Sequence, residues 1–205
     1  MHELRDLAPG LWIWRIPHPD WRPELDWPQL VTSTCVESGG EVALLDPLAP
    51  PEGSDAWERL DAKPPTMVVV LKPDHVRDVD LFVERYGARG FGPWLFFRDD
   101  APRTELEPIE PDMELPGGLR TLFDARWRNE TPVWLPEQKT LVFADGLTAP
   151  EGELRIWGTR QLDRARAAFR EHLELPFERV IVAHGEPVHD RAAYERALGL
   201  PPYEG

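Results

Sequence analysis

The stretch that decides the fold of this chain is residues 67–75, with the sequence MVVVLKPDH. Five apolar residues in a row, three of them β-branched, predict a short strand that is buried on both faces. Lys72, Asp74 and His75 follow this strand directly. In sheets that are covered by helices, ligand and catalytic sites collect beyond the carboxyl ends of the strands. This strand end is therefore a candidate functional site.

Two further buried strands are predicted to end in the same way. Residues 140–143 run into Asp145, and residues 179–183 run into His184, with a glycine directly after each of these two polar residues. Glycine lets the chain turn tightly where a strand ends. Three such ends can converge on one point, and carboxylate oxygens and imidazole nitrogens are ligands that suit Zn²⁺, Fe or Mn²⁺. The pattern indicates one shared site.

Each of these residues also has a structural explanation of its own. Asp74 is well placed to cap a helix that ends at Gly87. Asp145 lies in an Ala-Asp-Gly sequence, which is a common turn composition. A single histidine at a strand end is more often a core or loop residue than a ligand, and this applies to His75 and to His184. Their joint placement, rather than any one residue, indicates a site.

Hydrophobic periodicity and turn signals predict strands and helices along most of the chain. The other predicted strands are residues 11–16, 30–37, 41–45, 119–123 and 132–135, with strand fragments at 94–97, and the predicted helices are residues 54–60, 75–86, 160–172 and 190–198. The Gly39-Gly40 pair between two strands predicts a hairpin. Strands with helices interspersed predict two sheets that are covered by helices.

Composition limits the function classes. The 205 residues include 23 Lys and Arg and 37 Asp and Glu, a formal net charge of −14. So acidic a chain repels phosphate backbones and anionic membranes, and we expect a small molecule as partner, with no nucleic acid and no membrane. Cys35 is the only cysteine, and neither a signal peptide nor a membrane-spanning run is present. We expect one domain over residues 1–205, in the cytoplasm.

Several stretches resemble the metallo-β-lactamase superfamily, and the resemblance extends over nearly the whole chain. The stretches are residues 8–12 (APGLW), 37–46 (ESGGEVALLD), 136–139 (PEQK), 141–145 (LVFAD) and 180–185 (VIVAHG). They resemble the first strand of the family, its second hairpin, the turn before the bridging aspartate, the strand that delivers this aspartate, and the strand with the last histidine. The resemblance implies an α+β fold, an αββα sandwich of two mixed β-sheets flanked by helices, with metals at one edge of the sheets.

The defining motif of this superfamily is only half present. Its His-x-His-x-Asp-His sequence corresponds to residues 70–75, VLKPDH, in which Val70 and Lys72 replace the two leading histidines. No histidine occurs from residue 76 to residue 171, and Arg126 lies near the place of the third histidine of the first metal position. The resemblance therefore implies a degenerate site that has lost its first set of ligands. The second set is retained as Asp74, His75 and His184, with Asp145 as the former bridge between two metals.

One function that follows from this pattern is enzymatic. The chain would hydrolyse an ester, thioester or phosphoester with water activated by one divalent metal ion. A cationic side chain would stabilise the negative charge that develops on the substrate. The ligands of a Zn, Fe or Mn ion would be Asp74, His75, Asp145 and His184, and the candidate catalytic residues are Asp74, Lys72 and Arg126.

The other function is that of a metal-free, non-catalytic protein that binds a small ligand. Lys72 and Arg126 then replace the charge of the missing metal, because crowded carboxylates such as Asp74 and Asp145 need a compensating cation. Several of the nine tryptophans lie between residues 12 and 27, where they line a pocket, form the face of a homodimer or pack in the core. The sequence favours this second function slightly and leaves enzymatic activity open.

Two more histidines carry expectations. His18 lies in a Pro- and Trp-rich connection, residues 17–28, which is a candidate to fold over the mouth of the pocket. His172 lies in a predicted helix close to two glutamates, and the simplest expectation for it is a place on the surface.

Overall fold

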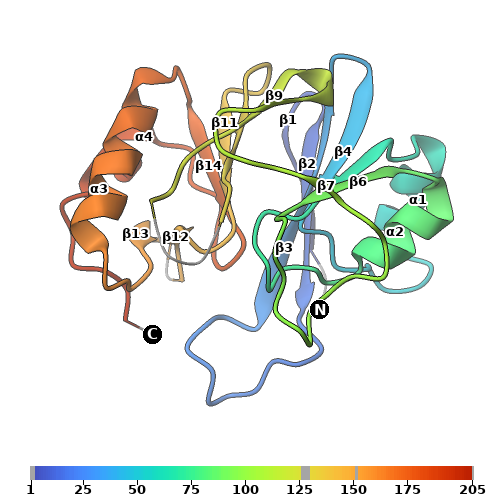
Figure 1. Ribbon diagram of the computed structural model, residues 1–205, viewed down its shortest axis with the longest axis horizontal. Coiled ribbons are helices and arrows are strands. Elements are labelled where there is room, and N and C mark those ends of the chain that lie inside the picture. Colours follow the sequence, from blue (N-terminus) through green and yellow to red (C-terminus); the bar gives the residue numbers. More distant parts are fainter. Residues whose placement is uncertain (1–2, 126–129, 151, 205) are drawn as a thin grey trace.

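The chain forms two β-sheets that lie face to face, with helices on the outer side of each sheet (Figure 1). It is seen here in a computed structural model, which describes residues 3–125, 130–150 and 152–204. Figure 1 shows the layers edge-on, with C-terminal helices at the left and the helices of the first half at the right. The order helix, sheet, sheet, helix confirms the αββα sandwich expected from the sequence.

The first sheet contains seven strands in chain order. They are β1 (Glu3–Ala8), β2 (Leu11–Pro17), β3 (Leu30–Ser38), β4 (Glu41–Leu45), β5 (Met67–Val69), β6 (Arg89–Gly92) and β7 (Glu107–Pro108). Neighbours are antiparallel from β1 to β4 and parallel from β4 to β7. The predicted hairpin joins β3 and β4 through Gly39 and Gly40, which both have positive φ angles that cost glycine little.

The second sheet contains five strands in the order β14-β11-β10-β9-β8. They are β8 (Glu114–Leu115), β9 (Leu119–Thr121), β10 (Val133–Leu135), β11 (Thr140–Phe143) and β14 (Arg179–Val182). β14 and β11 are parallel, and the other neighbours are antiparallel, so this sheet is mixed as well. A separate two-stranded sheet is formed by β12 (Leu147–Thr148) and β13 (Arg155–Ile156).

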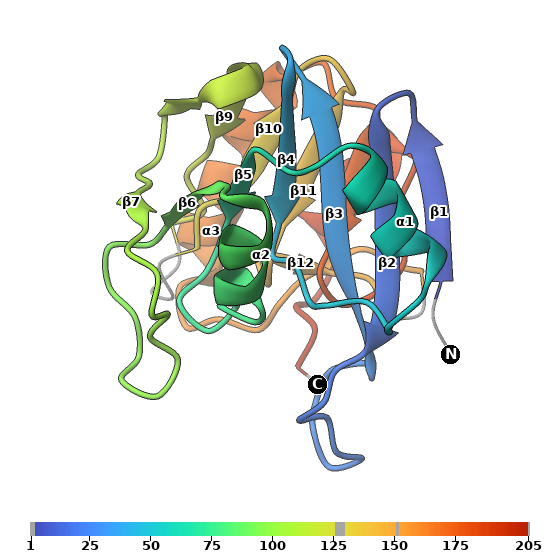
Figure 2. The ribbon, with the colours of Figure 1, turned by 90° about the vertical axis from the view of Figure 1, so that its right-hand side faces the viewer.

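Four α-helices cover the two outer faces. α1 (Asp55–Ala62) and α2 (Val79–Tyr86) lie over the first sheet, as Figure 2 shows, and α3 (Leu162–Glu171) and α4 (Arg191–Ala197) lie over the second. Short 3₁₀ turns occupy Pro116–Gly118 and His172–Glu174. Within the described residues, no helix is both long and apolar enough to span a membrane.

Side chains on the strands divide between three apolar layers. From β5, Met67 and Val69 face the other sheet, whereas Val68 and Val70 face α1 and α2. All four are at most 1% exposed. A strand that is covered on both faces needs an apolar side chain at every position, which explains why residues 67–71 show no alternation.

Some local predictions were wrong. Residues 94–97 form no strand, but belong to the loop after β6, where Trp94, Leu95 and Phe97 are exposed. Their aromatic composition is typical of a strand, but no neighbouring strand pairs with them. α2 begins after Asp78 rather than after Asp74, because the carboxylate of Asp74 is engaged elsewhere. The polar edge strand β1 carries no clear apolar pattern and was not predicted.

His172 is buried rather than on the surface. Its Nε2 donates to the carbonyl of Phe123 at 3.0 Å, and its Nδ1 lies 3.1 Å from the hydroxyl of Tyr194. Burial disfavours the charged imidazole and lowers the pKa of His172 to about 4. The ring thus ties the 3₁₀ turn after α3 to α4 and to the end of β9.

A lowered pKa of His172 predicts an acid-sensitive stability. Between pH 6.5 and 4 the unfolded chain binds a proton at this residue that the folded chain does not, so the free energy of unfolding falls as the pH decreases. From pH 7 to pH 5 the loss attributable to His172 is about 2 kcal/mol. Urea unfolding at pH 7 and at pH 5 should show that the free energy of unfolding of His172→Gln changes by about 2 kcal/mol less than that of the wild type. His189→Gln is the comparison: partial burial and Arg179 also lower the pKa of this exposed histidine, and its removal should change the pH dependence less than His172→Gln does. An equal dependence in His172→Gln and wild type would contradict the assignment.

Candidate functional site

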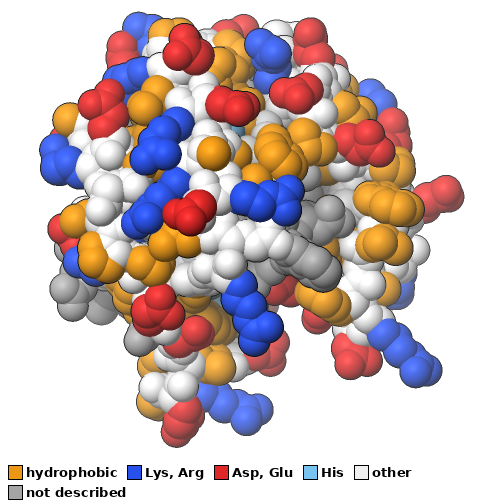
Figure 3. Space-filling model, turned by 60° about the vertical axis from the view of Figure 1, so that its left-hand side comes forward, with side chains coloured by type: hydrophobic (Ala, Val, Ile, Leu, Met, Phe, Trp, Pro, Cys, Tyr) orange, Lys and Arg blue, Asp and Glu red, His pale blue; other side chains and the backbone are white. Residues whose placement is uncertain are grey.

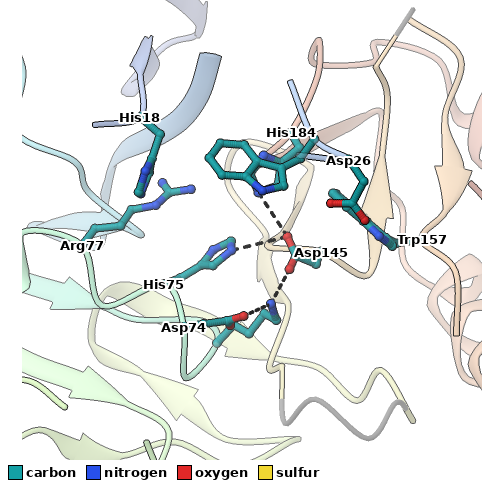
Figure 4. Close-up of a pocket in the computed structure, with 10 residues that line it drawn as sticks. His18, Asp26, Asp74, His75, Arg77, Asp145, Trp157 and His184 are labelled. Carbon is teal, nitrogen blue, oxygen red and sulfur yellow. Dashed lines mark hydrogen bonds and ion pairs between the residues drawn. The ribbon is translucent and has the colours of Figure 1, made fainter. Parts of the chain in front are cut away.

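The three strand ends singled out in the sequence meet at one edge of the two sheets. β5 and its continuation deliver Lys72, Asp74 and His75, β11 delivers Asp145, and β14 delivers His184 (Figure 4). Together they line a cavity of about 310 Å³. His75 comes from the first sheet, while Asp145 and His184 come from the second, so the site spans the gap between the sheets.

Lys72 lies at the centre of the site. Its side chain is 2% exposed, and its ammonium group contacts the carboxylates of Asp74, at 2.6 Å, and of Asp145. Burial opposes a charged amine, but the two carboxylates outweigh burial and raise the pKa of Lys72 above its ordinary value. A permanent positive charge therefore separates two acids that would otherwise repel each other.

His75 lies between two carboxylates. Its Nδ1 is 2.8 Å from Oδ2 of Asp46, and its Nε2 is 3.4 Å from Oδ1 of Asp145. Burial opposes the imidazolium, but Asp145 and Asp46 outweigh it and raise the pKa of His75 to about 9. The other oxygen of Asp46 accepts from the backbone N–H of Leu71 at 2.7 Å. Asp46 therefore fixes the orientation of the His75 ring relative to the end of β5.

Two residues beside His75 have a strained backbone. Asp46 has φ = 47° and Arg77 has φ = 46°, a region that non-glycine residues rarely occupy. The guanidinium of Arg77 donates to the carbonyls of Thr32, at 2.8 Å, and of Asp46, at 2.5 Å. Such conformations cost on the order of 1–3 kcal/mol each and occur preferentially at functional sites. The backbone around His75 thus has the character of a binding or catalytic site.

The position of Asp145 is fixed from behind by Glu130. This buried carboxylate accepts from the backbone N–H groups of Ala144, at 3.0 Å, and of Asp145, at 2.8 Å. Burial would raise the pKa of Asp145, but the charges of His75 and Lys72 hold it well below its ordinary value. Asp145 is therefore an anion that faces both cations.

His184 is held through its backbone. Its carbonyl accepts from the hydroxyl of Thr148 at 2.7 Å and from the N–H of Ala149 at 3.0 Å. The next residue, Gly185, has φ = 127°, and a Cβ there would lie 2.2 Å from the carbonyl oxygen of Ala149, so only glycine fits. The Nε2 of His184 lies 3.4 Å from Oδ1 of Asp145. Burial lowers the pKa of His184, which favours the neutral ring.

Arg77 and four residues from loops complete the lining of the cavity. His18, Asp26 and Trp27 come from the loop between β2 and β3, which projects beyond the edge of the sheets in Figures 1 and 2. His18 thus lies at the pocket, as expected. Trp157 follows β13. The cavity wall therefore combines charged groups from strand ends with aromatic groups from loops.

Among the described residues, the donor atoms at this site fit at most one metal ion. At the position of the first metal, the ammonium of Lys72 and the apolar Val70 offer no ligand. At the second position, His75, Asp145 and His184 each offer an atom within 4.8 Å of the others. The bond from His75 to Asp46 is the kind that orients a metal-binding histidine. Asp74 lies outside this group of three, since its carboxylate faces Lys72.

Sequence reasoning found some of these residues and missed others. The structure brings Lys72, Asp74, His75, Asp145 and His184 together, and Arg126 lies outside the described residues. The residues that were missed as parts of the site are Asp26, Asp46, Arg77, Glu130 and Trp157. Asp46 follows β4 directly, so the rule that sites collect at strand ends is a signal that could have found it. The others lie in connections without such a signal.

The shape of the chain matches solved structures of metallo-β-lactamases along its whole length. The DIM-1 metallo-β-lactamase has a TM-score of 0.71 at 13% identity, with 97% of this chain and 96% of that chain covered. A metallo-β-lactamase from Pontibacter korlensis has a TM-score of 0.69 at 19% identity, with 98% of both chains covered. FIM-1 from Pseudomonas aeruginosa, solved in its mono-zinc form, has a TM-score of 0.69 at 16% identity, with 97% and 94% covered.

This chain has the metallo-β-lactamase fold. The fold expected from the sequence is thereby confirmed. No protein-family model and no curated protein sequence matches the chain. At identities below 20% the structural matches establish the fold alone, and the chemistry has to be argued from the residues of this metallo-β-lactamase-like site.

The buried contact between Lys72 and Asp145 predicts strong coupling. Lys72→Met leaves Asp145 without its ammonium partner, and we expect a loss of about 3 kcal/mol in the free energy of unfolding. The double variant Lys72→Met/Asp145→Asn removes both charges and should recover part of this loss. Urea unfolding of the single and double variants measures the coupling, and Glu178→Gln, which breaks an exposed ion pair with Lys139, is the control with a loss below about 1 kcal/mol. Strictly additive losses would show that the contact does not stabilise the site.

Proposed function

We propose that this protein is a metal-free member of the metallo-β-lactamase fold whose pocket binds a small molecule without hydrolysing it. The observation that carries the proposal is the buried ammonium of Lys72 in contact with Asp74 and Asp145. It occupies the place where the resemblance implies the first metal. The lysine charge thus supplies what a metal supplies elsewhere in this fold, namely compensation for crowded carboxylates.

The charges around the pocket support this proposal. Three cationic side chains, Lys72, His75 and Arg77, face three acidic ones, Asp46, Asp74 and Asp145. A divalent ion in the same space would lie next to the ammonium, and two like charges a few ångströms apart repel by several kcal/mol in a partly buried site. Cationic side chains therefore already lie against the buried carboxylate of Asp145 without a metal.

A single-metal hydrolase is the second candidate, and one observation favours it. His75, Asp145 and His184 offer three donor atoms within 4.8 Å, and Asp46 orients His75. A bound metal would lower the pKa of a water molecule and so supply a nucleophile for an ester, thioester or phosphoester. In that case Lys72 holds Asp145 and Asp74 in place and contributes positive charge next to the substrate.

The partner in either case is a small molecule. On the face shown in Figure 3, Lys and Arg side chains are interspersed with Asp and Glu rather than gathered in one basic stripe. Proteins that bind nucleic acid present such a stripe to the phosphates. The net charge of −14 supports the same proposal.

Metal content per chain separates the two candidates. The full chain, purified without chelator, is equilibrated with excess Zn²⁺, Mn²⁺ or Fe²⁺, desalted and analysed for each element. We expect much less than one ion per chain in the wild type. In Lys72→Ala, removal of the ammonium should tighten Zn²⁺ binding at least tenfold, measured by calorimetry.

About one ion per wild-type chain, lost in Asp145→Ala, would overturn the metal-free proposal. It would establish the second candidate as the one to test, with ester, thioester and phosphoester substrates. Equal Zn²⁺ affinity in wild type and Lys72→Ala would show that the ammonium does not exclude a metal.

A further inference from the structure

One side of the cavity is built from aromatic rings in contact with one another. The ring of Trp27 lies 5.4 Å from that of His18 and 5.1 Å from that of His184, and the ring of Trp157 lies 5.4 Å from that of His184. We call these four residues the aromatic wall. They come from the loop after β2, from the segment after β13 and from the end of β14, so three distant parts of the chain build it.

The mouth of the cavity is acidic. Asp26 and Asp74 are exposed, whereas Lys72 and His75 are buried beneath them and already engaged with carboxylates. Within the described part of the chain, the carboxylate of Asp26 has no hydrogen-bond or ion-pair partner. Asp26 is therefore an exposed carboxylate at the cavity that no described side chain neutralises.

Positive and negative groups lie on opposite sides of the site. Figure 4 shows Arg77 beside His18 on one side of His75, and Asp26 with Trp157 on the other side, beyond Asp145. Arg77 is also bound to two backbone carbonyls. The part of the cavity next to Asp26 and Trp157 therefore lies away from Arg77 and combines aromatic rings with an acid that has no partner among the described residues.

We infer that this pocket binds an organic cation whose alkylated ammonium group lies against the aromatic wall and faces Asp26. The inference rests on the proposed metal-free function and names its ligand class. Aromatic faces attract cations through the negative potential of their π systems, and quaternary ammonium groups are the ligands for which proteins use this most. The carboxylate adds attraction, and the acidic surface of the chain raises the encounter rate with a cation.

A pair of molecules of equal shape tests the inference on the full wild-type chain. Choline carries a quaternary ammonium, and 3,3-dimethyl-1-butanol has a carbon in place of the nitrogen and no charge. We expect calorimetry to show saturable binding of choline with an affinity at least tenfold above that of the neutral alcohol. Equal binding of the two molecules, or no binding of choline at millimolar concentration, would overturn the inference.

Variants locate the binding and separate it from fold and metal effects. Asp26→Asn and Trp27→Leu should each weaken choline binding about tenfold, since a desolvated cation–π contact contributes about that much. Asp163→Asn and Trp94→Leu change an exposed acid and an exposed tryptophan that do not line the cavity, and should bind choline as the wild type does. Equal effects in both pairs of variants would overturn the assignment to this cavity.

Failure of the ligand inference can be distinguished from failure of the metal-free proposal. Metal content is measured on the same preparations, and a protein with one ion per chain fails the metal-free proposal whether or not choline binds. Displacement of choline by Zn²⁺ with tighter affinity would show that the cavity is a metal site and would overturn the inference. A protein that holds no metal and does not bind choline would contradict the proposed ligand class but not the metal-free function.

Discussion

The contact between Lys72 and Asp145 is the interaction on which the rest of the site depends. Lys72 follows β5 in the first sheet and Asp145 follows β11 in the second, so one buried ion pair joins the two sheets at their shared edge. A buried charge is tolerated only when it is paired and hydrogen-bonded. The surrounding groups supply this pairing: Asp74 on the ammonium, and His75 on the carboxylate of Asp145.

This arrangement explains how a metallo-β-lactamase fold persists with half of the family motif. In the fold as the resemblance describes it, metals hold the carboxylates and imidazoles of the edge together. In the proposed metal-free state the Lys72 ammonium takes over that electrostatic task, while contacts within the chain hold the backbone of the edge. Asp46 ties β4 to β5, and Glu130 binds the backbone at the end of β11. These two carboxylates therefore hold the backbone at the ends of β5 and β11 beside the Lys72–Asp145 pair.

The same geometry gives the pocket two unlike sides. Charged groups come from strand ends, where direction and depth are set by the sheets, and aromatic groups come from the connections that fold over the edge. Strand ends deliver side chains with little freedom, whereas loops vary readily in length and composition. In this chain the strand ends supply Lys72, Asp145 and His184, and the loops supply the aromatic rings.

Short-range patterns predicted the strands and the centre of the site, whereas the αββα order of the layers was implied by the resemblance to the metallo-β-lactamase superfamily. The unbroken apolar run of residues 67–71 indicates a strand covered on both faces, and the polar residues after three such strands meet because parallel strand ends share one edge. His172, Asp26, Glu130 and Trp157 could not be placed in this way. The partner of His172, the carbonyl of Phe123, lies 49 residues away along the chain, and nothing in the local sequence distinguishes a surface histidine from one that a distant carbonyl holds in the core. Asp26 and Trp157 reach the cavity only because distant segments pack at the same edge. Periodicity and strand ends are local properties that a sequence carries, but the pairing of a buried polar group with a distant partner exists only once the layers have packed.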